Sequence, residues 1–252
     1  MQPHRIDGTV ALVTGANRGI GRALTEALLA RGARKVYAAV RTPEALRTLR
    51  DERLVSLRLD VTDADQIRAL PDAVSDLELV FNNAGVQLGT GLAESGVLDQ
   101  ARREMEVNYF GPLQLLHRLA PTLARNGGGT VVNIGSAAGL TSVPFFPTYS
   151  ASKAALHSLT QAARILLASQ GTSVAGVYAG PVDTDMTRDL PLAKTSPRDV
   201  AVAILDGIEA GQEDIFPDPF AVDFGRQFAS SPKASERQMA AMAAAMRSPS
   251  AA

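Results

Sequence analysis

The sequence predicts an α/β protein, a doubly wound three-layer sandwich built around a seven-stranded parallel sheet. Seven short runs rich in β-branched and apolar residues alternate with longer segments of helical periodicity. The short runs are almost continuously apolar, as are strands that helices cover on both faces. No stretch rich in Pro, Gly or Ser divides the chain, so residues 1–252 are expected to form one domain.

Each element follows from its own pattern. The expected strands are residues 9–14, 35–40, 54–59, 77–82, 130–135, 173–178 and 214–216. Apolar residues at helical spacing predict helices at residues 20–31, 63–75, 101–125, 149–169 and 197–210. Residues 217–252 follow the last strand as a C-terminal extension, for which we expect one short helix after Pro232 and a loose end.

Composition excludes several classes of function. The net charge of -1 gives no reason to expect a nucleic acid or an anionic membrane as a partner. There is no cysteine, which excludes disulfides and thiolate catalysis, and the three histidines lie too far apart to predict a metal site. Neither a signal-peptide pattern nor an apolar run of about 18 residues occurs, so a cytoplasmic protein is expected.

A glycine-rich turn joins the first strand to the first helix. Residues 14–21 read Thr-Gly-Ala-Asn-Arg-Gly-Ile-Gly, and Gly15, Gly19 and Gly21 let the backbone approach a pyrophosphate at the helix N-terminus. The spacing G-x-x-x-G-x-G differs from the common G-x-G-x-x-G fingerprint. Glycines serving geometry alone are the alternative, but a turn directly after the first strand favours a nucleotide site.

The end of the second strand bears on the choice of cofactor. An NAD site usually offers an acidic side chain to the ribose 2′-hydroxyl about 20 residues after the turn. This chain has Arg41 there, and its first acid is Glu44, in the next segment. Arg41 and Arg18 can fork hydrogen bonds onto a 2′-phosphate, whereas the alternative is two solvated surface arginines. Their joint placement favours NADP(H).

A tyrosine and a lysine open the long helix after the fifth strand. Tyr149 and Lys153 are four residues apart, so both side chains point from one helical face. A nearby ammonium stabilises phenolate and would lower the pKa of Tyr149, which makes the phenol a usable acid and base. The spacing also arises by chance. Ser136 and Asn83, each at the carboxyl end of a predicted strand, support a site because ligands bind at that edge.

Together these motifs resemble the short-chain dehydrogenase/reductase family, in its NADP-preferring branch of about 250 residues. The resemblance runs from residue 8 to about residue 216 and includes the turn at residues 14–21 and the segment Asn82-Asn83-Ala84-Gly85. It also includes the catalytic set Asn108, Ser136, Tyr149 and Lys153. After the sixth strand the family pattern P-G-x-V-x-T is matched at Gly180, Val182 and Thr184, with Ala179 in place of proline.

The resemblance implies a Rossmann-like fold and carbonyl reduction or alcohol oxidation with NADP(H). Tyr149 would be the general acid and base, Ser136 would bond the substrate oxygen, and Lys153 would tune Tyr149 and bind the nicotinamide ribose. Asn108 would hold a water that relays protons to Lys153. The residues expected to bind the cofactor are Gly15, Asn17, Arg18, Gly19, Ile20, Gly21, Arg41, Asp60, Val61, Asn83, Ala84, Gly85, Tyr149, Lys153, Gly180, Val182 and Thr184. A homodimer or homotetramer formed through the two long helices is also implied.

Apolar residues that would border the nicotinamide predict a hydrophobic ketone or aldehyde as substrate. They are Val86, Leu88, Leu140, Phe145, Phe146, Val182, Met186 and Leu190. Phe220, Phe224 and Phe228 repeat at helical spacing in the C-terminal extension. This extension is expected either to close over the substrate pocket or to pack at a subunit interface.

Two other classes of function compete with this interpretation. A non-catalytic NADP(H)-binding regulatory protein would be expected to lose part of the set Asn108, Ser136, Tyr149 and Lys153, yet all four are present. A lyase on a related fold, such as a halohydrin dehalogenase, predicts an arginine in place of Lys153 and a degraded glycine turn. Neither feature occurs.

Overall fold

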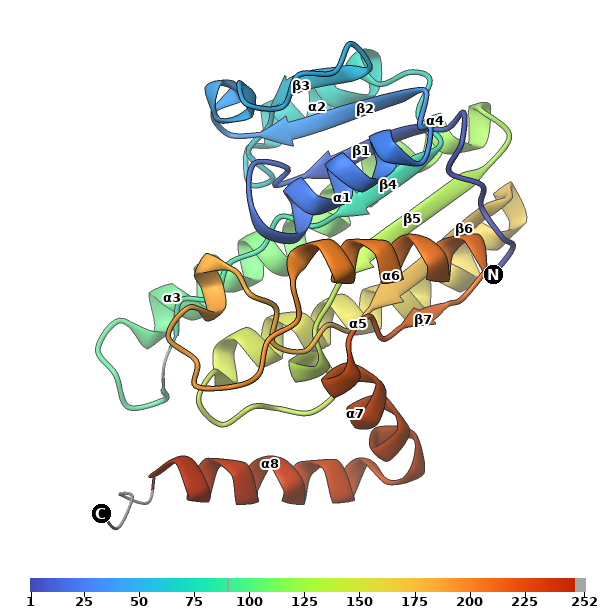
Figure 1. Cartoon of the computed structure of the whole chain (residues 1–252). Helices are drawn as coiled ribbons and strands as arrows, with labels where there is room; N and C mark the ends of the chain where they lie inside the picture. The colour runs from blue at the N-terminus through green and yellow to red at the C-terminus, as the bar shows by residue number, and fades with distance from the viewer. Residues whose placement is uncertain (90, 248–252) are drawn as a thin grey trace.

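The computed structural model describes residues 1–89 and 91–247 and contains a seven-stranded parallel sheet in the order β3-β2-β1-β4-β5-β6-β7 (Figure 1). The predicted doubly wound α/β sandwich is therefore confirmed, and every predicted strand boundary lies within two residues of the observed one. The strands are β1 (Val10–Thr14), β2 (Lys35–Val40), β3 (Leu54–Arg58), β4 (Leu79–Asn82), β5 (Gly129–Ile134), β6 (Thr172–Val177) and β7 (Asp214–Ile215).

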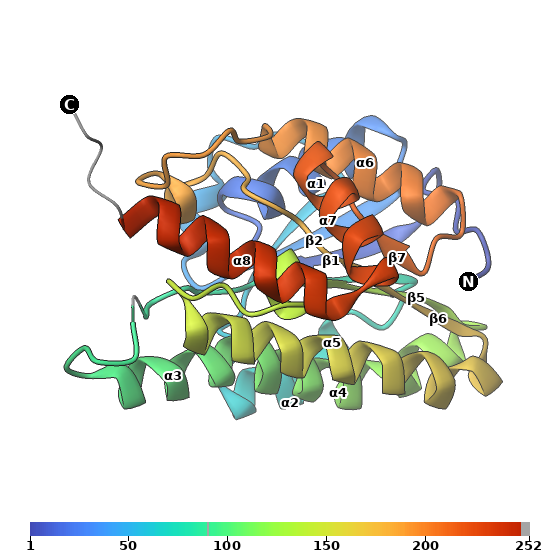
Figure 2. The same ribbon diagram turned by 90° about the horizontal axis from the view of Figure 1, so that it is seen from below.

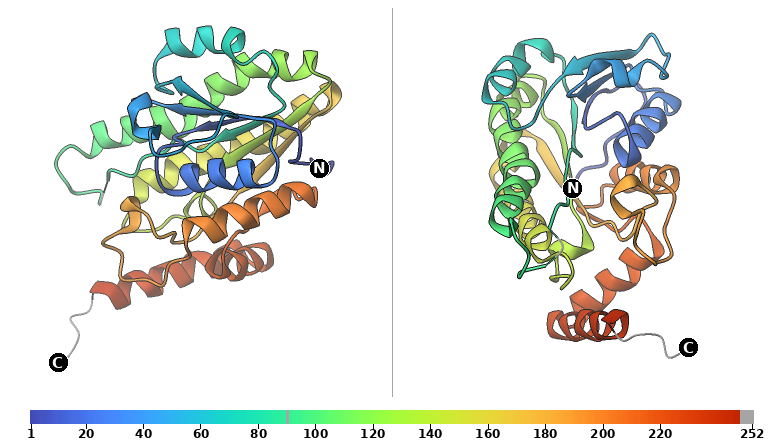
Figure 3. Two further views of the ribbon diagram at one scale, coloured as in Figure 1. Left: turned by 45° about the horizontal axis from the view of Figure 1, so that its top comes forward. Right: turned by 90° about the vertical axis from the view of Figure 1, so that its left-hand side faces the viewer.

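Helices cover both faces of this sheet, as the end-on view in Figure 3 makes plain. Alternate residues of one strand point to opposite faces, so a single strand feeds two hydrophobic cores. Val13 of β1 packs in one core with Leu24 and Ile204, whereas Leu12 packs in the other with Leu119. The helices on the first face are α1 (Gly19–Ala30) and α6 (Pro197–Glu209); those on the second are α2 (Ala64–Ala73), α4 (Gly111–Arg125) and α5 (Pro147–Leu167).

The helix predicted at residues 101–125 is divided in the structure. α3 (Val97–Met105) passes through a π-helical turn, Glu106–Phe110, into α4. A π turn widens the helix by one residue and is frequent at functional sites. Asn108 lies at its centre and is fully buried. The apolar period continues across the turn, which is why the sequence pattern predicts one helix.

The C-terminal extension contains two helices where the sequence predicts one short helix. α7 (Pro219–Ser230) carries the three phenylalanines, and α8 (Pro232–Arg247) runs for 16 residues. Both lie outside the three layers, beside the β7 end of the sheet (Figures 1 and 2). The expected loose end falls partly on residues 248–252, outside the described residues. Within residues 1–89 and 91–247, every helix is too short or too polar to cross a membrane.

Candidate active site and cofactor cleft

A cleft of about 440 Å³ lies over the carboxyl ends of the strands, where all seven parallel strands terminate on the same side. Twelve of the residues predicted to bind the cofactor line it: Gly15, Asn17, Arg18, Gly19, Ile20, Gly21, Arg41, Asp60, Val61, Asn83, Ala84 and Gly85. The structure thus brings together side chains and backbone from the ends of four strands. The cleft has the length of wall that a dinucleotide requires, from the glycine turn to the segment after β4.

The glycine turn is tight enough that side chains are excluded from it. Gly15 and Gly19 have φ values of +68° and +53°, in the left-handed region, and a Cβ at Gly21 would collide with the carbonyl oxygen of Gly15. Asn83 Nδ2 donates to Thr14 O (2.8 Å), which fixes the turn to the end of β4. The resulting cradle leaves backbone N–H groups at the start of α1, so the residues present fit a pyrophosphate.

Basic side chains surround the β2 and β3 end of the cleft. Arg41 is exposed on the cleft wall, and Arg103 of α3 lines the same wall. Burial acts to raise the pKa of Asp60, but hydrogen bonds from Thr62 and the charges of Arg103 and Arg41 outweigh it and hold this pKa below its usual value. Arg103 is absent from the predicted site because only the packing of α3 against Thr62 brings it there (Nη1 to Oγ1, 3.3 Å).

Arg18 has a different partner from the expected phosphate. Its Nη1 atom donates to Asp185 Oδ2 at 3.0 Å, an exposed ion pair between the glycine turn and the segment after β6. A Cβ at Gly19 would lie 3.2 Å from Thr184 Cγ2, so Thr184 stands directly beside the turn. Both contacts bring the segment after β6 to the mouth of the cleft. Asp185 is a lining residue that the motifs did not indicate.

A second pocket of about 130 Å³ adjoins Tyr149, and no charged side chain lines it. Of the eight predicted substrate-bordering residues, Phe145, Phe146 and Leu190 line this pocket. Met186 instead lines the cofactor cleft, and Val182 is buried in the core between the sheet and α1. The other apolar lining residues, most of which the motifs did not indicate, are Ala137, Ala138, Val143, Pro144, Ala179, Pro181, Leu192, Phe220, Phe224, Met239 and Met242.

Tyr149 lies where the two halves of the site meet. Burial raises the pKa of Tyr149 to about 12; the hydrogen bond with Ser136 opposes this rise, and the negative charge of Glu104 adds to it. The direction differs from the sequence-based expectation of a lowered pKa, because burial favours the neutral phenol. A phenol held in its neutral form is suited to donating a proton.

Lys153 is buried one helical turn beyond Tyr149, with 5% of its surface exposed. Its Nζ atom donates to Ile134 O (2.8 Å) and lies 5.8 Å from the centre of the Tyr149 ring. Burial lowers the pKa of Lys153 to about 8, since desolvation penalises the ammonium. A Cβ at Gly85 would lie 3.5 Å from Nζ, so the lysine reaches the wall of the cofactor cleft.

Asn108 links three segments through its side-chain amide. Nδ2 donates to Val86 O (2.8 Å) and to Ser152 Oγ (2.9 Å), and Oδ1 accepts from Val86 N (2.9 Å). Ser152 Oγ in turn donates to Tyr149 O (2.7 Å). These contacts make Asn108 a clamp between the segment after β4 and the start of α5. The water-holding role that the resemblance implies would therefore fall mainly on the backbone of the π turn.

The segment after β6 is fixed by an acid that the motifs did not indicate. Asp218 is buried, and its Oδ2 accepts from Gly180 N (2.8 Å) while Oδ1 accepts from Ala221 N at the start of α7 (2.8 Å). The Ala179 carbonyl accepts from Ala137 N (3.0 Å). The segment is thus held at both strands although Ala179 replaces the family's proline.

Neither histidine on the two long helices reaches the catalytic set. His157 Nδ1 lies 2.6 Å from Tyr178 Oη, and burial lowers the pKa of this histidine. His117 is exposed on α4. In the described part of the chain, no cluster of three or more His, Asp or Glu side chains could hold a metal ion.

The fold and this arrangement define a nucleotide-dependent dehydrogenase, and comparison with known proteins specifies the family. The family model described as short chain dehydrogenase matches residues 9–195. The chain therefore belongs to the short-chain dehydrogenase/reductase family and is an oxidoreductase of that type. Its length of 252 residues agrees with the predicted branch.

Similar proteins cover nearly the whole chain. A short-chain dehydrogenase from Burkholderia cenocepacia J2315, solved in complex with NADP, is 37% identical with a TM-score of 0.89, covering 94% of this chain and 99% of that one. A short-chain dehydrogenase from Streptomyces avermitilis is 29% identical with a TM-score of 0.81, covering 96% and 100%. An uncharacterized oxidoreductase of Myxococcus xanthus is 34% identical over 226 residues, 84% of this chain and 88% of that protein.

Proposed function

We propose that this protein reduces a hydrophobic ketone or aldehyde to its alcohol with NADPH. The observation that carries the proposal is the position of Tyr149, whose hydroxyl is shared with Ser136 at the junction of a polar cleft and an uncharged pocket. A carbonyl oxygen at that junction would meet a proton donor and a hydrogen-bond donor together.

The chain's own residues would carry the proton chemistry. When bound, the cofactor supplies the hydride that the carbonyl carbon accepts. Tyr149 Oη gives its proton to the carbonyl oxygen as negative charge develops there, and Ser136 Oγ donates a hydrogen bond to the same oxygen. Lys153 stabilises the phenolate that remains, and its ammonium restores the proton from solvent. Asn108 keeps the start of α5 and the segment after β4 in register during this cycle.

The choice of NADPH rests on Arg41 and on a similar protein. No acid lies at the end of β2, and Arg41 is free to face a 2′-phosphate from the cleft wall, with Arg103 nearby. The Burkholderia cenocepacia protein, 37% identical, was solved with NADP. Arg18 would exchange its exposed pair with Asp185 for the phosphate at little cost, since such surface pairs contribute little.

The C-terminal extension would complete the substrate pocket within one catalytic domain. Phe220 and Phe224 stack with their ring centres 6.0 Å apart and line the pocket, and Met239 and Met242 of α8 line it too. Unbranched methionines adapt to differently shaped apolar ligands. We therefore propose that α7 and α8 close over an uncharged, bulky substrate.

A dimer or tetramer is proposed on separate grounds. Ile165 and Leu166 of α5 are exposed by 79% and 73%, and Phe110 beside α4 by 39%. Large apolar side chains on the two long helices would be covered by a second copy of this chain. Light scattering coupled to size-exclusion chromatography of the parent and of Ile165→Asp measures the state; a monomeric parent contradicts the proposal.

Turnover with purified protein tests the function. NADPH or NADH is mixed with a panel of aryl and aliphatic ketones, and the absorbance of the reduced cofactor is followed. We expect oxidation of NADPH with the bulky apolar ketones and preference over NADH. Cofactor binding without turnover across the whole panel would instead favour a non-catalytic binding protein.

The cofactor preference has its own variant. Arg41→Ala is expected to raise the KM for NADPH by about 10- to 100-fold, the value of a lost charge-assisted contact, while the KM for NADH stays unchanged. Arg47→Ala removes a neighbouring exposed arginine that does not line the cleft and is the matched control. Equal losses with NADPH and NADH would refute the role of Arg41.

A further inference from the structure

A buried carboxylate stands close to the catalytic set. Glu104 of α3 is completely buried, and its Oε1 atom accepts hydrogen bonds from Leu88 N (2.7 Å) and Gly89 N (3.1 Å). Within the described residues its Oε2 atom has no hydrogen-bond partner, and no ion pair involves this side chain. Burying a carboxylate with one oxygen uncompensated is costly, so its retention asks for a physical reason.

The surroundings of Glu104 concentrate negative potential at the start of α5. Thr148 Oγ1 and Gln100 Oε1 are also buried and without partners, and a Cβ at Gly89 would lie 2.5 Å from the first and 3.6 Å from the second. Three oxygens from α3 and α5 therefore converge on Gly89, which precedes no cation. Thr148 is the residue before Tyr149, so this cluster adjoins the proton donor.

We propose that Glu104 is a positioning residue with two tasks: Oε1 fixes the segment after β4 at Leu88 and Gly89, and its charge disfavours phenolate at Tyr149. This inference rests on the proposed function, because it concerns the proton that Tyr149 donates. The charged groups that face Tyr149 are Glu104 from α3 and Lys153 from its own helix; the segments that line the substrate pocket offer none.

The consequence is a bias between the two directions of reaction. Reduction needs the phenol, and oxidation of the alcohol needs the phenolate. The negative charge of Glu104 raises the pKa of Tyr149, so reduction persists to higher pH and oxidation is confined to alkaline solution. The carboxylate would thereby make this enzyme act as a reductase.

Glu104→Gln separates the two tasks, because the amide keeps an oxygen for both N–H groups but carries no charge. We expect the alkaline limb of kcat for ketone reduction to move down by about one pH unit, with KM for the ketone unchanged. Glu104→Ala should show the same movement and a raised KM. Asp99→Asn, which removes a charge from an 85% exposed side chain of the same helix, is the control and should leave the profile unchanged.

A second variant leaves the carboxylate in place. Gln100→Lys puts an ammonium four residues before Glu104, on the same face of α3, from a half-buried position that reaches solvent. It should move the alkaline limb in the same direction as Glu104→Gln. If the profiles of Gln100→Lys and Glu104→Gln both coincide with that of the parent, the electrostatic task is refuted.

Amide hydrogen exchange keeps this test separate from the proposed function. Exchange at Leu88 and Gly89 should accelerate in Glu104→Ala and stay at the parent rate in Glu104→Gln. A parent that turns over none of the ketones overturns the proposed function, whereas equal exchange in all three proteins overturns the anchoring task of Glu104.

Discussion

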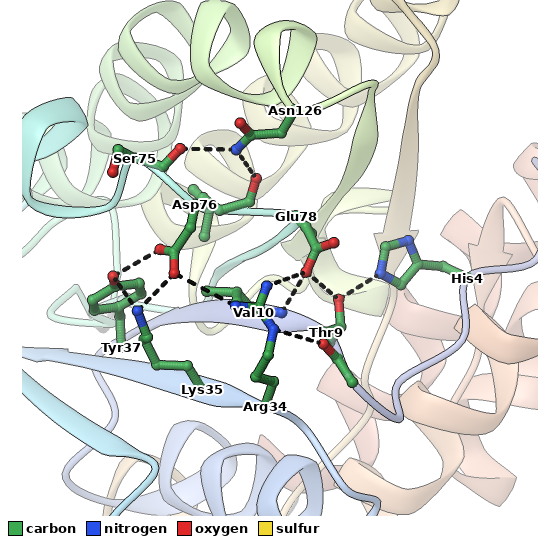
Figure 4. Close-up of polar contacts among 12 residues, drawn as sticks. His4, Thr9, Val10, Arg34, Lys35, Tyr37, Ser75, Asp76, Glu78 and Asn126 are labelled. Atoms are coloured by element: carbon green, nitrogen blue, oxygen red, sulfur yellow. Dashed lines mark hydrogen bonds and ion pairs between the residues drawn. The ribbon is translucent and has the colours of Figure 1, made fainter.

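At the amino edge of the sheet, where the strands begin, polar side chains meet partners from neighbouring strands (Figure 4). Asp76 accepts from Lys35 Nζ (2.6 Å) and from Tyr37 Oη (2.8 Å). Glu78 Oε2 accepts from the backbone N–H of Val10 (2.8 Å), and His4 lies 3.1 Å from Thr9 Oγ1. The pKa of Lys35 is raised chiefly by its hydrogen bond to Asp76, so pairing favours its charged form.

At the carboxyl edge the ionisable groups are buried with little compensation. Tyr149 and Lys153 are each shifted toward the neutral form by burial, and Glu104 lacks a cationic partner among the described residues. The amino edge therefore stabilises the fold through paired charges, whereas the carboxyl edge retains groups whose protonation changes easily. Variants at the two edges should accordingly separate activity from stability.

The largest effect is expected at Tyr149. Tyr149→Phe keeps the ring and removes the proton donor, so kcat for ketone reduction should fall by about 10³-fold. The free energy of unfolding should change by no more than about 1 kcal/mol, since Ser136 keeps a contact with Ala179 O (3.4 Å). Steady-state kinetics and urea unfolding measure both. Retained activity in this variant would refute the proton-donor assignment.

Lys153→Met should lower activity and raise stability. We expect kcat to fall by about 10²-fold because the phenolate loses its cation. The pKa of about 8 in the folded protein lies below the unfolded value, so the buried ammonium destabilises the fold most below pH 8. Removing it should raise the free energy of unfolding by about 2 kcal/mol at pH 7, after allowance for the lost bond to Ile134.

The pH dependence supplies the check on this stability effect. Between pH 8 and the unfolded pKa near 10.5 the unfolded chain binds more protons than the folded one, so the parent gains stability as pH rises. The difference between Lys153→Met and the parent should therefore shrink over that range in urea unfolding. A variant less stable than the parent at pH 7 would show that Lys153 is a structural residue.

The smallest effect belongs to the amino edge. Asp76→Asn should reduce the free energy of unfolding by about 1 kcal/mol at neutral pH and leave kcat unchanged, because the pair is partly exposed and far from the cleft. Although burial opposes it, the bond to Lys35 lowers the pKa of Asp76, so its stabilisation is present above pH 4 and is lost as pH falls further. Asp65→Asn, an 83% exposed acid, is the control.

By itself the sequence determined the architecture and most of the cleft. Strand and helix periods are local, and parallel strands necessarily end at one edge, so motifs at Gly15, Arg41 and Asn83 could be assigned to one site before any packing was known. The break at Asn108 was beyond this reasoning because the apolar period continues through the π turn.

Only the tertiary structure decided how these groups are tuned. The raised pKa of Tyr149 comes first from burial, which depends on elements distant in the chain. Asp218 reaches Gly180 across 38 positions, and Met239 joins the substrate pocket from the last helix. Such contacts leave no periodic signal, since they arise from the packing of whole elements. The chemistry therefore has residues that a motif identifies and an environment that only the fold creates.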